Sequence, residues 1–208
     1  MPAASSPAAR RAVAVESFMT AGQAIGPLSP GVSIFAITRG QFSMIDAVEY
    51  CLDEAGPAEV SLWTWTVADY EIQSLKRLQN GGKITSGLLV VDGGARTKNK
   101  EIINSWQADF GPDSVRYCRN HAKIATIKNS KYKLLLRGSM NLNFNPRFEQ
   151  FDLTEGGPDF DLVKQVEAEL PLLPNTCTGA QVYAASRVSE AFSSEQLDMF
   201  SGCKMWAK

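Results

Sequence analysis

The stretch RNHAKIATIKNSKYKLLLRGSMN, residues 119–141, contains the only histidine of the 208-residue chain, His121. Two strand-like runs, HAKIATI and KYKLLLRG, are joined by the polar turn KNS, and this spacing predicts a β-hairpin. Because residues two apart on a strand point to the same face, His121 and Lys123 should present an imidazole and an ammonium side by side. A structural or solvent-facing histidine is the simpler interpretation of the pair taken alone.

Positive charge is concentrated around this hairpin, although the whole chain has a net charge of −1. Residues 116–147 contain 8 lysines and arginines and no acidic residue. Residues 1–115 contain 9 basic and 12 acidic residues, and residues 148–208 contain 4 and 10. The basic segment favours a phosphate-rich partner, while the acidic remainder argues against a protein that coats nucleic acid indiscriminately. On charge alone, a solvated basic hairpin is the preferred interpretation.

Three strand-like runs before the hairpin are each followed by a helical pattern. The pairs of run and helix are 32–38 with 43–56, 58–67 with 68–82, and 84–94 with 97–112. Such units imply right-handed crossovers and an α/β fold, with a mainly parallel or mixed sheet flanked by helices on both faces. A further helix is expected at 159–170.

The length and the 44% hydrophobic content are sufficient for one main domain, expected at 31–170. Residues 1–30 are rich in Ala, Ser, Pro and Gly, which predicts a flexible arm or a short helix docked elsewhere. Residues 171–208 are expected to form a linker and a C-terminal helix, which could serve packing or assembly.

The sequence predicts a cytoplasmic protein. Glu16 interrupts the N-terminal segment before it could form the apolar part of a secretory signal, and no window is long enough to span a membrane. The four cysteines form no close CxxC pair, so reduced and mostly buried thiols are expected rather than disulfides or a zinc site.

The residues that end the hairpin add chemistry suited to phosphate. A neutral imidazole nitrogen can attack phosphorus, and a nearby lysine can offset the charge that develops, so this scheme needs no metal or cofactor. Gly138 allows a close backbone approach, while Ser139 and Asn141 can donate hydrogen bonds to phosphate oxygens. Glu149 could orient the imidazole of His121. An ordinary ion pair with the basic segment explains Glu149 equally well.

In this order, the residues resemble the signature of the phospholipase D superfamily, H-x-K, then G-S/G-x-N, then a downstream Glu. The matching elements read His121-Ala122-Lys123, Gly138-Ser139-Met140-Asn141, and Glu149 within NPRFEQFD. The similarity extends upstream and covers about residues 31–170. The resemblance implies that His121 is the nucleophile, that Lys123, Ser139 and Asn141 bind phosphate beside Gly138, and that Glu149 is the partner of His121.

Active sites of that superfamily combine two such motifs, and the second histidine protonates the leaving group. This chain has one motif and one histidine, so the resemblance implies a homodimer with His121 of each subunit facing across a two-fold axis. It also implies a metal-independent phosphodiesterase without a cofactor, namely a nuclease that hydrolyses DNA.

The chain departs from the family pattern between the two parts of the motif. The family's Asp falls on Lys128, five residues after Lys123, and the gap to Gly138 is longer than usual. A second interpretation therefore stays open: a weakly active or inactive nucleic-acid-binding or structural component of a phage or other mobile element. The residues predicted to contact nucleic acid are Arg119, Lys128, Lys131, Lys133 and Arg147, although the lysines could equally keep the turn solvated.

Overall fold

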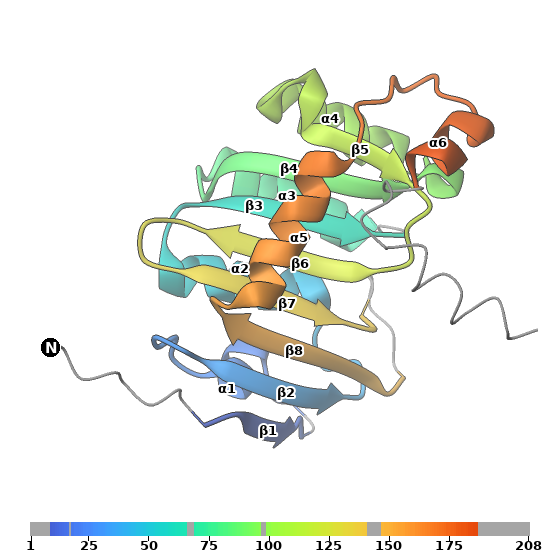
Figure 1. The fold of residues 1–208 in the computed structure, drawn as a ribbon. Helices are drawn as coiled ribbons and strands as arrows, with labels where there is room; N and C mark the ends of the chain where they lie inside the picture. The colour runs from blue at the N-terminus through green and yellow to red at the C-terminus, as the bar shows by residue number, and fades with distance from the viewer. Residues whose placement is uncertain (1–8, 17, 66–68, 97–98, 141–146, 187–208) are drawn as a thin grey trace, which may run out of the picture.

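The computed structural model of the chain describes residues 9–16, 18–65, 69–96, 99–140 and 147–186. These residues are built around an eight-stranded mixed sheet in the order β1-β2-β8-β7-β6-β3-β4-β5 (Figure 1). The strands are β1 (Arg11–Ala14), β2 (Ser33–Thr38), β3 (Ala58–Thr64), β4 (Ile84–Asp92), β5 (Val115–Cys118), β6 (Lys123–Lys128), β7 (Lys133–Gly138) and β8 (Glu149–Glu155). The expected α/β class with a mixed sheet is confirmed.

Helices cover both faces of the sheet, as the alternating pattern predicted. Helix α5 lies across one face, and α2, α3 and α4 lie on the other (Figure 1). The helices are α1 (Ala21–Ile25), α2 (Met44–Ala55), α3 (Asp69–Asn80), α4 (Lys100–Phe110), α5 (Pro158–Glu169) and α6 (Gly179–Ala185), with short 3-10 turns η1 (Gly93–Ala95) and η2 (Pro112–Ser114).

The sheet is parallel only toward its two edges. Strands β3, β4 and β5 pair in parallel, as do β1 and β2. Between β2 and β3, the β6–β7 hairpin and β8 insert in antiparallel pairing. The first strand-helix-strand unit therefore joins two strands that are not neighbours. The central place of β7 agrees with its burial, because Leu134, Leu135 and Leu136 are all buried, as in a strand covered on both faces.

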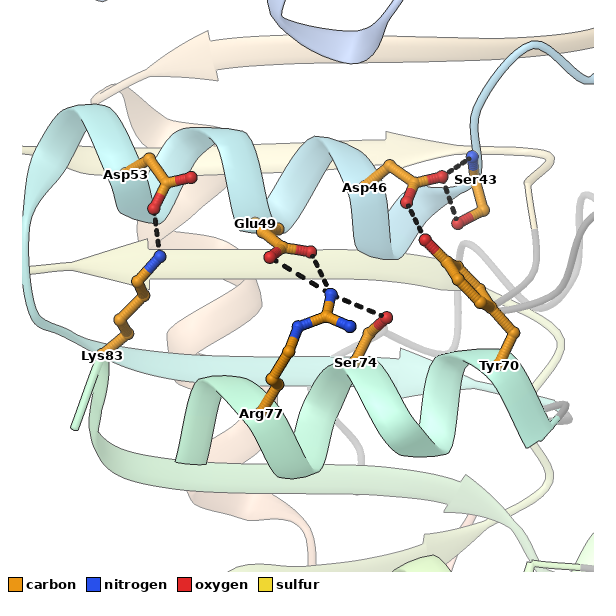
Figure 2. Close-up of polar contacts among 8 residues, drawn as sticks. All are labelled: Ser43, Asp46, Glu49, Asp53, Tyr70, Ser74, Arg77 and Lys83. Atoms are coloured by element: carbon orange, nitrogen blue, oxygen red, sulfur yellow. Dashed lines mark hydrogen bonds and ion pairs between the residues drawn. The ribbon is translucent and has the colours of Figure 1, made fainter. Parts of the chain in front are cut away.

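Helices α2 and α3 lie side by side and are connected by polar side chains (Figure 2). Tyr70 donates a hydrogen bond of 3.1 Å to Asp46, and Arg77 contacts Glu49 at 3.0 Å. Such exposed contacts contribute no more than about 1 kcal/mol each. Burial of the apolar faces therefore supplies most of the stability, with Ile45 and Leu75 both fully buried.

The start of the described chain belongs to the domain rather than to an arm. Residues Arg11–Ala14 pair with β2, and Ala24 and Ile25 of α1 are buried. The alternative of a short docked helix describes α1, whereas β1 was not predicted, because four residues are too few to show a periodic pattern. Residues 1–8 and 17 lie outside the described residues.

The segment after α5 also packs on the domain. Cys177 and Val182 are buried in the main hydrophobic core, so the described part of the predicted linker is anchored. The predicted C-terminal helix is represented by α6, and residues 187–208 lie outside the described residues. Cys51, Cys118 and Cys177 are free and buried. None of the helices in the described residues combines the length and apolar composition of a bilayer-spanning segment.

A buried carboxylate on α5 attaches this helix to the sheet. Glu167 is only 4% exposed and accepts hydrogen bonds from the Ser61 hydroxyl at 2.5 Å and the Trp63 indole at 2.9 Å. Lys164, one turn earlier, forms an ion pair with the same carboxylate. The charge is therefore buried together with the donors that compensate it.

We expect Glu167→Ala to lower the free energy of unfolding by about 2–3 kcal/mol, because Ser61 and Trp63 lose their acceptor. Glu169→Ala is the matched control, since Glu169 is exposed on the same helix and should change the value by less than about 0.5 kcal/mol. Urea denaturation of the two variants measures both values. Equal losses of unfolding free energy in the two variants would contradict the role of Glu167 in attaching α5 to the sheet.

Candidate active site

Three neighbouring central strands bring the parts of the predicted motif together at one end of the strands, which is called the site edge of the sheet below. Lys123, the first residue of β6, is paired with Gly138, the last residue of β7. Gly138 is in turn paired with Phe151 of β8, which begins at Glu149. The start of β6, the end of β7 and the start of β8 therefore meet, although they are far apart in the sequence (Figure 1).

His121 and Lys123 are in contact, as the spacing predicted. The Lys123 Nζ atom lies 3.1 Å from Nδ1 and 3.2 Å from Nε2 of His121, and it donates a hydrogen bond of 2.6 Å to the His121 carbonyl oxygen. His121 is exposed, whereas Lys123 is only 7% exposed. Burial lowers the pKa of the Lys123 ammonium, and the charge of Glu149 opposes this shift.

The expected position of His121 within a strand is wrong, because β6 begins only at Lys123. His121 belongs to the loop 119–122 between β5 and β6. Two side-chain contacts keep this loop out of the ladder: Lys123 binds the His121 carbonyl oxygen, and Asn120 accepts the Ala122 N–H at 2.9 Å. The contact between the imidazole and the ammonium is thus made by a loop and a strand end.

Asn120 holds this loop against the ends of β3 and β4. It is 5% exposed, its backbone N–H donates to Asp92 Oδ2 at 2.9 Å, and its side-chain amide donates to the Thr64 carbonyl at 3.2 Å. Asp92 also accepts the Gly94 N–H at 2.8 Å. Asn120 therefore determines where the backbone presents His121.

Ser139 and Glu149 form the other side of the site. The Ser139 hydroxyl donates a hydrogen bond to Glu149 Oε2 and accepts one from the Gln150 N–H at 3.0 Å. The Ser139 N–H donates to the Gln150 carbonyl at 3.0 Å. The Glu149 carboxylate thus acts electrostatically on the Lys123 ammonium and accepts the hydrogen bond of the Ser139 hydroxyl. Its predicted contact with His121 stays a prediction.

Gly138 is required by the close packing of β7 on β8. A methyl group at this position would clash with the Gln150 carbonyl oxygen and would lie 2.9 Å from Phe151 Cα, a distance that real Cβ contacts do not show. The close backbone approach expected at Gly138 is therefore found, and the group that approaches is β8. Its predicted role toward phosphate stays a prediction.

The structure therefore places five of the predicted residues, His121, Lys123, Gly138, Ser139 and Glu149, at the site edge of the sheet. Arg119 lies in the same loop as His121, and exposed Arg147 precedes Glu149 by two residues. Asn141 lies outside the described residues.

Three lysines predicted to contact nucleic acid lie at the opposite end of the hairpin. Strand β6 runs from Lys123 to Lys128, which separates the two ends by about 16 Å at the usual rise of a strand. Lys128 faces Glu59 at 3.8 Å, and Lys133 faces Asp161 at 3.6 Å. Lys131 is exposed in the turn. The structure does not bring these lysines to His121, and any contact they make with nucleic acid stays a prediction.

Sequence reasoning did not assign a role to Trp65, Asp92 or Asn120. The centroid of the Trp65 ring lies 6.1 Å from that of His121, while Asp92 and Asn120 position the loop. Trp65 and Asp92 follow or end parallel strands, and ligands of open α/β sheets bind at the carboxyl ends of such strands. This rule, together with the adjacency of Asn120 to His121, is the signal that could have found them.

The chain was compared with known proteins and solved structures. No family model and no curated protein matches it. NucT from Helicobacter pylori is similar, with a TM-score of 0.44 and 15% identity over 64% of this chain and 92% of that one. Phosphatidylserine synthase from Haemophilus influenzae Rd KW20 has a TM-score of 0.49 and 14% identity, over 82% of this chain and 46% of that one.

A third similar structure is polyphosphate kinase from Porphyromonas gingivalis, with a TM-score of 0.44 and 18% identity, over 70% of this chain and 28% of that one. The chain thus spans about half of the synthase and about a quarter of the kinase. Since the identities are 14–18% and the TM-scores are below 0.5, the chemistry of the site is derived from its own residues.

We expect Asn120→Ala to lower the free energy of unfolding by about 1–3 kcal/mol, because the Thr64 carbonyl loses its donor and the Ala122 N–H loses its acceptor. It should also speed hydrogen exchange of the Ala122 amide, which would no longer be bonded. Asn104→Ala, an exposed position on α4, is the control and should change the stability by less than about 0.5 kcal/mol. Unchanged exchange at Ala122 would show that Asn120 does not position the loop.

Proposed function

We propose that the protein is a metal-independent phosphodiesterase, a nuclease that hydrolyses DNA through a phosphohistidine intermediate. The observation that carries this proposal is the contact of the buried Lys123 ammonium with the exposed imidazole of His121. A nucleophile is thereby accessible while a cation is held beside it in a partly desolvated position. Such a cation stabilises developing charge more strongly than one in water does.

The proposed reaction has two displacements at phosphorus. An imidazole nitrogen of His121 attacks, the bond from phosphorus to the leaving oxygen breaks, and a proton passes to that oxygen. Water then attacks the phosphohistidine and gives a proton to the group that protonated the leaving oxygen, the P–N bond breaks, and the imidazole is regenerated. Lys123 offsets charge on the phosphoryl oxygens. The Ser139 hydroxyl, which donates to Glu149 in this structure, would turn to donate its single hydrogen to one of these oxygens.

The leaving oxygen needs an acid, and the chain has a single histidine. We therefore assign the acid to His121 of a second subunit in a symmetric homodimer, with the two imidazoles facing one phosphodiester. In a two-fold arrangement each histidine can serve as either nucleophile or acid. Asn141 completes the phosphate ligands in this proposal.

Nucleic acid is the proposed substrate because the residues around the site are basic. Arg119 precedes His121 by two residues and Arg147 precedes Glu149 by two residues, and the Lys123 ammonium lies in the site itself. The three lysines at the other end of the hairpin are not part of these surroundings. A polyanion gains affinity from such a surface in a salt-dependent way. The alternative is a protein of the same fold that binds nucleic acid with little or no turnover. Lys128, which replaces the family's Asp and faces Glu59, keeps this alternative open.

We expect the purified protein to cleave single- or double-stranded DNA in the presence of EDTA, and His121→Ala to lose this activity by at least about 10³-fold, as loss of a covalent nucleophile does. Glu169→Ala, which changes an exposed residue on α5, is the control and should retain activity. Tight binding without cleavage by the wild-type protein would favour the binding alternative. Cleavage that survives in His121→Ala would contradict the proposed nucleophile.

A further inference from the structure

A pocket of about 530 Å³ opens beside the loop that carries His121. Its lining combines the end of β3, the turn η1 after β4, the loop 119–122 and helix α6. The residues that line it include Trp65, Asp92, Arg119 and Tyr183. It is separate from the contact between Lys123 and His121, because neither of these residues lines it, and the function proposed above does not use it.

Three of the side chains that line this pocket are flat, namely those of Trp65, Arg119 and Tyr183. Trp65 is 45% exposed and Tyr183 is 48% exposed. The Arg119 guanidinium lies over the Tyr183 ring, 5.6 Å from its centroid. Indole, phenol and guanidinium faces are the groups on which the bases of single-stranded nucleic acids stack. The lining is therefore suited to a planar aromatic ligand.

The charges in the pocket favour a neutral ligand over a phosphate. Arg119 and Asp92 contribute one positive and one negative group, in contrast to the cationic environment at Lys123. The Asp92 carboxylate is a hydrogen-bond acceptor that already binds the N–H groups of Asn120 and Gly94. A phosphate would be repelled by this carboxylate, whereas the N–H group of a base could donate to it.

The wall formed by α6 is packed directly on η1. A methyl group on Gly93 would clash with Val182, which is buried in the core. The Ser186 hydroxyl, just after α6, accepts the Arg119 N–H at 2.5 Å. These contacts connect α6 to both the turn after β4 and the loop 119–122. The pocket is therefore formed before a ligand arrives, which lowers the entropic cost of binding.

The pocket and the proposed phosphate site are neighbours. The rings of Trp65 and His121 are 6.1 Å apart between centroids, and Arg119 is two residues from His121 in the same loop. We propose that this pocket binds a nucleobase next to the phosphodiester held at His121. The position of the phosphodiester in this proposal rests on the proposed function. The proposal also makes a single-stranded nucleic acid the substrate, since a base must leave its stack to enter the pocket.

The test compares two ligands that differ only in their bases. Fluorescence anisotropy measures the binding of a short labelled oligothymidylate and of an abasic oligomer with the same number of phosphates. All measurements use a His121→Ala background so that no ligand is consumed. We expect Trp65→Ala to weaken binding of oligothymidylate by about 5- to 150-fold, the range for loss of one stacked base, and to leave binding of the abasic oligomer unchanged. Trp65→Phe should restore most of the affinity.

Tyr70→Ala is the matched control, because Tyr70 is 54% exposed on α3 and does not line this pocket. It should bind both ligands as the parent does. Equal affinity of the parent for the two ligands, no binding of either, or equal weakening of both by Trp65→Ala would overturn the base pocket. These results do not depend on turnover. If the protein cleaves DNA but fails this test, the proposed function stands and the base pocket is rejected. If it passes this test without cleaving DNA, the base pocket stands and the proposed nuclease function is rejected.

Discussion

The register of three antiparallel strands is the constraint on which the candidate site depends. Lys123 pairs with Gly138, and Gly138 pairs with Phe151. At Gly138 the backbone of β8 comes so close that no side chain fits. Because a shift by one residue would turn each side chain to the opposite face, this pairing decides that Lys123, Ser139 and Glu149 meet at the site edge.

The electrostatics of the site follow from this geometry. The Lys123 ammonium is withdrawn from water, which lowers its pKa, and Glu149 acts in the opposite direction. The His121 carbonyl oxygen accepts one of the ammonium's hydrogen bonds, so the buried charge is partly compensated within the protein. The same ammonium also lies against the imidazole of His121, which stays exposed. A buried cation and an accessible ring are complementary, because the cation need not reorganise when charge develops on a bound phosphate.

Much of this arrangement could be predicted from local patterns. The alternation of strands and helices predicted the α/β class, and the KNS turn predicted the β6–β7 hairpin that the structure contains. The spacing of His121 and Lys123 predicted their contact. Predictions failed where the signal is not local. Nothing in the sequence of β1 distinguishes it from a loop, and the insertion of β8 between β2 and β7 depends on pairing between distant segments. The role of Asn120 depends on the ends of two other strands. The cluster of lysines is a case where sequence proximity misleads, because a hairpin carries its turn away from its ends.

The central claim is that one His121 supplies half of a two-histidine site, and subunit mixing tests it most directly. Wild-type protein and His121→Ala are exchanged at a constant total concentration, and exchange is verified with differently tagged subunits. Activity should fall as the square of the wild-type fraction, to about one quarter in an equal mixture, because only dimers with two histidines are complete. A linear fall to about one half would show that each subunit contains a complete site of its own, and would contradict the account.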